Sequence, residues 1–218
     1  MLWRNNGLSI VLVALFLLTM AGQALTGWHE RNQDAEAHAQ SSISLPQYLT
    51  SGHFLEATGE NWESEFLQMA MFVLLTVSLR QKGSAESKRI DVIETVDVDP
   101  REHKDDPEAP GPVRRGGLAL TLYENSLGLA FAVLFLISFA MHAKGGHREY
   151  NDEQQEHGQP TVSLSNYMAS SRFWFESFQN WQSEFLSLAA MVVGTIYLRQ
   201  RGSAESKPVH APHADTGR

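Results

Sequence analysis

The stretch NNGLSIVLVALFLLTMAGQALTGW, residues 5–28, decides the fold class of this chain. It contains no charged side chain, and residues 8–18 are almost entirely aliphatic or aromatic. An α-helix rises about 1.5 Å per residue, so roughly 20 residues cross a hydrocarbon core of about 30 Å. The stretch therefore predicts a transmembrane helix over residues 6–27.

A second long apolar run covers residues 125–144 and predicts another transmembrane helix. Two shorter runs, 66–79 and 185–198, hold about 14 uncharged residues each, a length that also fits a buried or re-entrant helix. Each is flanked by an arginine that can snorkel from the inner end and a tryptophan that suits the outer headgroup layer. These interface anchors are Arg80 and Arg199, with Trp62 and Trp181. We therefore predict spans at 62–80 and 181–199 as well.

The composition excludes several classes of function. The chain has no cysteine, which removes disulfides, thiolate metal sites and cysteine nucleophiles. Its formal net charge is −8 and it has no basic run, so no nucleic-acid partner is expected. The mean hydropathy of −0.25 is typical of a soluble protein, but this average hides the apolar blocks.

The sequence repeats itself. A shift of 119 residues aligns residues 6–88 with 125–207 without a gap, and the segment GSAESK at 83–88 recurs unchanged at 202–207. Residues 8–24 resemble a signal peptide, but their counterpart at 127–143 is internal, so we predict that both are permanent helices. Two helices per copy require both copies to have the same orientation, which is a parallel duplication.

The distribution of charge predicts the orientation. The segments between the paired helices, 28–64 and 147–183, are acidic, whereas residues 80–117 and the start of the tail carry most of the basic side chains. Positive-inside counting places both termini and the linker in the cytoplasm. The outer loops share the pattern SLPQYL at 44–49 and SLSNYM at 163–168, which predicts short interfacial helices.

The sequence thus predicts an all-α integral membrane protein with four transmembrane helices, arranged as two tandem, parallel helical hairpins. The segments are the first hairpin repeat at 1–88, a cytoplasmic linker at 89–117, the second hairpin repeat at 118–207 and a disordered tail at 208–218. Apolar residues within 90–98 also suggest a short strand in the linker. The expected location is the inner membrane of a bacterium.

Polar residues within the predicted spans form a candidate intramembrane site. Glu65 and Glu184 lie about 22 Å above the inner arginines, and Gln23 and His142 reach a similar depth in the preceding helices. We expect the pairs Gln23 with Glu65 and His142 with Glu184, which suit proton or cation handling. The interpretation that we favour is that these groups only join the helices by hydrogen bonds. A further alternative is that tilted helices or a thinned bilayer leave Glu65 in water. The full set is Glu65, Glu184, Gln23, His142, Asn61, Asn180, Ser64 and Ser183.

No catalytic motif is recognisable, so we expect no enzyme and no cofactor. The outer loops hold His29, His38, His53, His147 and His157 among acids, a combination that can bind divalent metal. None of these histidines has a recognised ligand spacing, and we interpret the loops as solvated and acidic, with no metal.

The signature NWxSEFL at 61–67 and 180–186, followed by a short span and RQKGS or RQRGS, resembles an uncharacterised family of bacterial multi-spanning inner-membrane proteins. The resemblance implies a membrane setting and transfers no activity. Three functions remain open: a non-enzymatic envelope protein that presents an acidic, aromatic outer surface to a protein partner, a lipid or a second copy; a small proton- or cation-linked channel or transporter; and, last, an intramembrane or outer-face metalloenzyme. The lipid bilayer and a homo-oligomer are the other expected partners.

Overall fold

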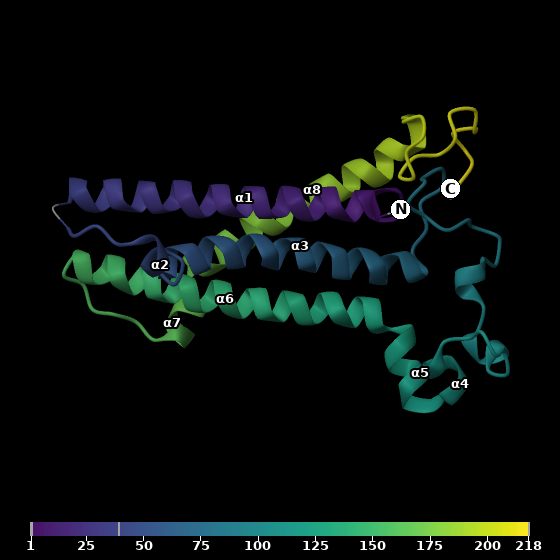
Figure 1. Ribbon diagram of the computed structural model, residues 1–218, viewed down its shortest axis with the longest axis horizontal. Helices are drawn as coiled ribbons and strands as arrows, with labels where there is room; N and C mark the ends of the chain where they lie inside the picture. The colour runs from purple at the N-terminus through teal and green to yellow at the C-terminus, as the bar shows by residue number, and fades with distance from the viewer. Residues whose placement is uncertain (1, 39, 218) are drawn as a thin grey trace. The chain divides into compact units, whose positions relative to one another are not determined.

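The computed structural model describes residues 2–38 and 40–217, so Met1, Ala39 and Arg218 of the predicted segments lie outside the described residues. Every regular element within these ranges is helical, which confirms the all-α class (Figure 1). The α-helices are α1 (Leu2–Ala37), α2 (Leu45–Tyr48), α3 (Gly52–Ser78), α4 (Gly111–Arg115), α5 (Gly117–Glu124), α6 (Ser126–Glu156), α7 (Leu164–Met168) and α8 (Ser171–Tyr197). Two 3₁₀ helices, η1 (Thr95–Asp97) and η2 (Pro100–His103), lie in the linker.

The strand expected within residues 90–98 was a wrong prediction. The structure has bends followed by η1 there, because Glu94 and Asp97 side chains bind backbone amides locally. The Glu94 carboxylate accepts from the Arg89 amide at 2.8 Å, and the Asp97 carboxylate accepts from the Glu94 amide at 3.3 Å. Acidic side chains that bind nearby backbone compete with a strand ladder in this way.

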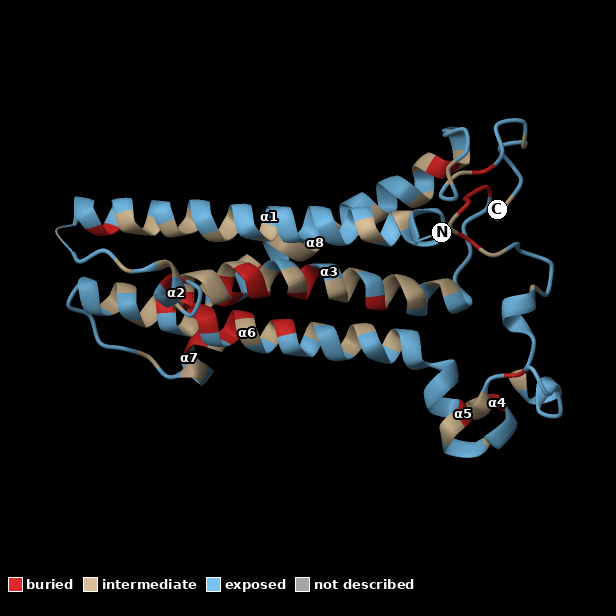
Figure 2. Cartoon of the chain, viewed as in Figure 1, coloured by how far each residue is buried: buried red, intermediate tan, exposed pale blue. Residues whose placement is uncertain are grey.

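Two helices, α1 and α6, are long and apolar enough to cross a membrane. Their large apolar side chains are exposed, for example Leu8 at 76 % and Leu18 at 69 % in α1. Figure 2 colours α1 pale blue over most of its length for this reason. Both helices also run past the predicted spans, to Ala37 and Glu156, and so carry polar helical ends beyond their apolar stretches.

The chain divides into two compact units, and each takes residues from both copies of the repeat. Unit 1 comprises Met1–Glu60 and Ala140–Trp174, and unit 2 comprises Asn61–Phe139 and Phe175–Arg218. Unit 1 therefore contains α1, α2 and α7, with the beginnings of α3 and α8 and the end of α6. Unit 2 contains the remaining lengths of those three helices, the linker and the tail.

In unit 1, the beginning of α3 packs directly on the end of α6 through glycines. A Cβ added to Gly59 would lie 2.9 Å from the Cα of His142, and one added to Gly145 would lie 2.8 Å from the carbonyl carbon of Leu55. Both distances are shorter than an ordinary van der Waals contact, so only glycine permits this approach. Small residues at helix contacts are typical of packing in membranes.

The two short helices of unit 1 each bury a tyrosine against a glycine. Tyr48 of α2 lies over Gly27, and Tyr167 of α7 lies over Gly146, with both tyrosines only 1 % exposed. The N-terminus of α7 is capped by the Ser163 hydroxyl, which accepts from the amide of Asn166. These helices coincide with the predicted interfacial segments at 44–49 and 163–168.

In unit 2, the linker has a small core of its own, formed by Ala109, Val113 and Leu120. The tail also has defined contacts, because the buried Lys207 ammonium donates to the carbonyls of Pro212, His213 and Asp215 at 2.7–3.3 Å. Linker and tail each therefore fold locally around a few side chains.

Candidate functional site

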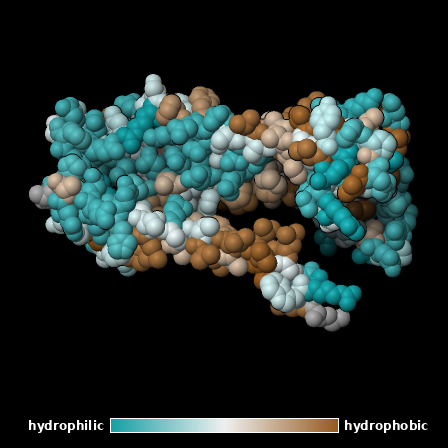
Figure 3. Space-filling model, turned by 90° about the horizontal axis from the view of Figure 1, so that it is seen from above, coloured by the Kyte–Doolittle hydropathy of each residue, from teal (hydrophilic) through white to brown (hydrophobic). Residues whose placement is uncertain are grey.

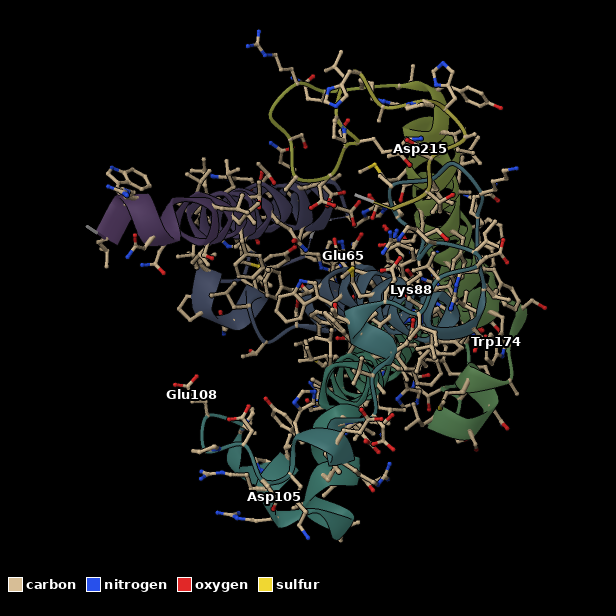
Figure 4. All side chains as sticks on the ribbon, turned by 90° about the vertical axis from the view of Figure 1, so that its right-hand side faces the viewer. Glu65, Lys88, Asp105, Glu108, Trp174 and Asp215 are labelled. Carbon is tan, nitrogen blue, oxygen red and sulfur yellow. The ribbon has the colours of Figure 1, made fainter. Side chains whose placement is uncertain are left out.

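The polar residues of α3 and α8 form a layer within unit 2. The side-chain amide of Gln68 donates to the backbone carbonyl of Glu184 at 2.8 Å and to the hydroxyl of Ser187 at 3.1 Å. Gln68 and Ser187 are 119 residues apart, the spacing of the sequence repeat. Glu65 lies one turn before Gln68 on α3, and Glu184 supplies the carbonyl that Gln68 binds, so these two glutamates, also matching positions of the repeat, lie at the same level of the contact between α3 and α8. Glu65 is labelled in Figure 4.

Glu63 and Gln68 also belong to this layer, and neither was among the predicted site residues. The Glu63 side chain is fully buried and accepts a hydrogen bond from the indole N–H of Trp181 at 2.9 Å. Trp181 was predicted only as an interface anchor, so the structure gives it a second role. Gln68 could have been found from helical spacing, because it lies one turn after Glu65 and therefore on the same face.

The serines and asparagines of the candidate set have local partners. Ser64 and Ser183 each donate to the carbonyl of the asparagine three residues earlier, Asn61 or Asn180, at 2.9 Å. The Asn180 side chain donates to the carbonyl of Glu176 on its own helix at 3.1 Å. These contacts are hydrogen bonds of a side chain to its own helix, the pattern expected of serine inside a helix.

Gln23 and His142 lie in unit 1, and each has partners there. The Gln23 amide donates to the Thr58 hydroxyl at 3.3 Å. His142 is fully buried and stacks on Phe173 with ring centroids 4.7 Å apart. A ring nitrogen of His142 and a carboxylate oxygen of Glu60 lie within 4.8 Å of each other. Within unit 1 the structure thus places Gln23 beside Thr58, and both expected pairs, Gln23 with Glu65 and His142 with Glu184, join residues of different units and stay predictions.

Arg80 and Arg199, which were predicted as anchors, cap the C-terminal ends of α3 and α8 in the same way. One guanidinium nitrogen of Arg80 donates to the carbonyls of Thr76, Val77 and Leu79 at 3.1–3.4 Å. Arg199 repeats this pattern with the carbonyls of Thr195, Ile196 and Leu198 at 2.8–3.2 Å. A cation at a helix C-terminus satisfies unpaired carbonyls and opposes the helix dipole. Trp62 is half-buried at the other end of this stretch of α3.

The polar ends of α1 and α6 are tied to the chain that follows them by matching asparagine clamps. The Asn32 side chain exchanges two hydrogen bonds with the backbone of Ile43, at 2.8 and 3.0 Å. Asn151 makes the same pair of bonds with Val162, at 2.8 and 3.1 Å. Each clamp therefore holds a residue just before α2 or α7 against the end of the preceding long helix.

Between these loops, unit 1 contains an ion-pair network. Arg31 lies 3.6 Å from a carboxylate oxygen of Glu149 and 3.7 Å from one of Glu156. The phenol of Tyr48 shares a hydrogen bond of 3.1 Å with His53, whose other ring nitrogen lies 3.8 Å from the Glu30 carboxylate. Burial raises the pKa of the Tyr48 phenol, and the negative charge of Glu30 raises it further.

The histidines of the outer loops are used as hydrogen-bonding groups. His147 contacts the Val162 carbonyl at 2.8 Å, and His38 and His157 contact carbonyls of their own helices at 3.0 and 2.8 Å.

Comparison with known proteins gives one match. A family model described as "Domain of unknown function (DUF6766)" matches residues 1–218. No curated protein and no solved structure is similar enough to the chain to count as a match.

Proposed function

We propose that this chain, which belongs to the family of the domain of unknown function DUF6766, is a non-enzymatic, multi-pass protein of the bacterial inner membrane. Its spans lie at 6–27, 62–80, 125–144 and 181–199, arranged as two tandem hairpins with both termini in the cytoplasm. Its acidic and aromatic outer surface binds a partner that carries basic groups.

The exposed apolar surface supports the membrane setting. Leu8, Leu12 and Leu18 of α1 are more than half exposed, as are Leu127 and Leu136 of α6. Each Å² of apolar surface left in water costs about 25 cal/mol, so two helices with this pattern are stable only when lipid or protein covers them. The 27-residue helices α3 and α8 continue the same arrangement, since each is followed by an arginine that caps its last carbonyls.

Matching contacts at positions 119 residues apart support the tandem arrangement. The asparagine clamps at Asn32 and Asn151, the tyrosines over Gly27 and Gly146, and the caps made by Arg80 and Arg199 all follow the sequence repeat. Hairpins built with the same contacts have the same direction through a membrane, because their loops leave from the same helix ends.

The observation that carries the proposed function is that the acidic loops are structurally ordered. The ends of α1 and α6 continue as helices and are fixed by the asparagine clamps, so their carboxylates have defined positions. In Figure 3 the end of the molecule that carries the C-terminal ends of α1 and α6 is covered by hydrophilic side chains. A rigid array of carboxylates favours a basic partner by charge complementarity, and it loses less conformational entropy on binding than a mobile loop.

Topology is the first test, and the absence of cysteine makes it direct. Single variants Glu36→Cys and Asp105→Cys would be treated with a membrane-impermeant maleimide in cells with a permeabilised outer membrane. We expect labelling at position 36 before lysis and at position 105 only after lysis. Labelling of position 105 from outside would overturn the proposed orientation.

Partner binding is tested by photo-crosslinking from a probe amino acid at position 36. We expect a discrete crosslinked species that weakens when Asp152, Glu153 and Glu156 are changed together to Asn, Gln and Gln. The matched control changes Asp105→Asn and Glu108→Gln in the linker, which leaves the outer charge unaltered. A crosslinking pattern that is insensitive to the outer charges would refute a role for this surface.

A second function is favoured by the proximity of Glu65 to Glu184. Two like charges on neighbouring helices repel, and sharing a proton or binding a cation relieves that repulsion. A proton- or cation-linked channel or transporter would show flux in liposomes that is lost in a Glu65→Gln, Glu184→Gln double variant and kept in the linker control. Equal flux in both variants would leave the two glutamates as groups that join the helices.

A further inference from the structure

The segment GSAESK, which occurs at 83–88 and again at 202–207, folds into the same turn both times. We call residues 81–88 the first turn and residues 200–207 the second turn. In the first turn, the amide of Gln81 donates to the Ser87 hydroxyl at 2.9 Å, and in the second turn Gln200 donates to Ser206 at 2.9 Å. The glycine in each has a positive φ, +86° at Gly83 and +81° at Gly202.

The first turn docks on the inner end of α8, within unit 2. The Ser84 hydroxyl lies 3.0 Å from the Thr195 hydroxyl, which also accepts from the Ala85 amide at 3.2 Å. Ser84 is fully buried, Ala85 is 4 % exposed and Thr195 is 6 % exposed. Tail residues cover the same turn, since the Gly83 amide donates to the Thr216 hydroxyl at 2.8 Å and the Gly217 amide donates to the Ser84 carbonyl at 2.9 Å. The contact with α8 and the tail together therefore remove Thr195 and Ser84 from solvent.

The second turn has no such cover among the described residues. Gly202 and Ala204 are exposed and Ser203 is half-buried, whereas their counterparts Gly83, Ala85 and Ser84 are buried. The Ser203 hydroxyl accepts from the Glu205 amide of its own turn at 3.0 Å. The second turn thus has the folded shape of the first but not its docking contact.

The surface that would receive the second turn is also open. Thr76 on α3 is the counterpart of Thr195 in the sequence repeat; it is half-buried, and among the described residues its hydroxyl donates to the carbonyls of Phe72 and Val73 on its own helix. Val77 and Leu79 beside it are 60 % and 61 % exposed. The chain therefore contains two copies of the turn and two copies of the threonine face that can bind it. The first turn is docked on the Thr195 face, whereas the second turn and the Thr76 face do not contact each other in this way.

We propose that a second copy of this chain makes the missing contact, with the second turn of one copy docked on the Thr76 face of α3 in the other. The second turn is the segment that we expect on the Thr76 face, because it has the same six residues, GSAESK, as the first turn, which is docked on the equivalent Thr195 face. Both halves follow the arginine-capped helix ends, so the two copies stand parallel in one membrane. Reciprocal docking closes the assembly at two copies. This inference is independent of the proposed outer partner.

Cysteine crosslinking tests the proposed interface. A Ser203→Cys chain and a Thr76→Cys chain with different affinity tags would be produced in the same cells, and their membranes oxidised with copper phenanthroline. We expect a reducible dimer that carries both tags. The reference variant Ser84→Cys, Thr195→Cys reproduces the docked version and should give a disulfide within one chain. The collision control pairs Thr76→Cys with Asp105→Cys in the linker.

The proposal is supported if the position 203 and 76 pair yields the mixed dimer well above the collision control. It is overturned if the mixed dimer stays at the level of that control while the reference variant oxidises. It is also overturned if Ser203→Cys and Thr76→Cys, placed in a single chain, form only an internal disulfide in a monomer. This result does not depend on the photo-crosslinking from position 36, so a failure of the proposed outer partner would leave the proposed dimer standing.

Discussion

Gly59→Ala is the substitution that tests the helix contact of unit 1 most directly. The new Cβ would lie 2.9 Å from the Cα of His142 and closer still to its amide nitrogen, and backbone atoms cannot rotate away as a side chain can. Restoring an ordinary contact requires α3 and α6 to separate by about 1 Å, and overpacking of this kind costs about 1–3 kcal/mol.

The matched control is Gly22→Ala in α1, where nothing lies within 4 Å of the added Cβ. Both substitutions replace a helical glycine with alanine and gain the same propensity, up to about 1 kcal/mol. The difference between the two variants therefore isolates the steric cost of the contact, about 1–3 kcal/mol. For a chain of this size each kcal/mol shifts the melting temperature by about 2–4 °C.

The assay is thermal unfolding in detergent, followed by intrinsic tryptophan fluorescence. We expect Gly59→Ala to melt about 2–12 °C below Gly22→Ala, and Gly145→Ala to behave like Gly59→Ala, because its Cβ would collide with the backbone of α3. Equal melting temperatures for Gly59→Ala and Gly22→Ala would refute the close approach of these two helices.

Three further predictions follow from single contacts. Thr195→Val should destabilise the docked first turn by about 1–3 kcal/mol, because it leaves the buried Ala85 amide without its acceptor and removes the hydroxyl bonded to Ser84. Faster proteolysis after residue 88 would report this loss, with exposed Thr19→Val as the unaffected control. Asn151→Ala should speed hydrogen exchange at the Val162 amide selectively, and unchanged exchange there would contradict the clamp. The Lys88 ammonium is the largest cause that holds the pKa of Asp97 below its ordinary value, so its contribution to linker stability is complete above pH 3.8 and is lost as the pH falls further. NMR titration should show the Asp97 pKa move back toward its ordinary value in Lys88→Met, because the remaining hydrogen bond from the Glu94 amide lowers it less.

The sequence by itself determined the elements. The uncharged stretch at residues 5–28 required a helix long enough to span a bilayer, and the repeat required its counterpart at 125–144 to behave alike. The patterns at 44–49 and 163–168 marked the positions of α2 and α7. These features are local, because hydrophobic length and turn chemistry act along the chain.

The partners of the polar side chains were decided only by the tertiary structure. Helical periodicity gives the face on which Glu65 lies but not the helix that faces it, and the bond from Gln68 to the Glu184 carbonyl shows that this helix is α8. The buried Glu63 could not be selected either, because its partner Trp181 lies far along the sequence. The first and second turns have the same local sequence, yet the first is docked and the second is exposed, so only tertiary packing distinguishes them.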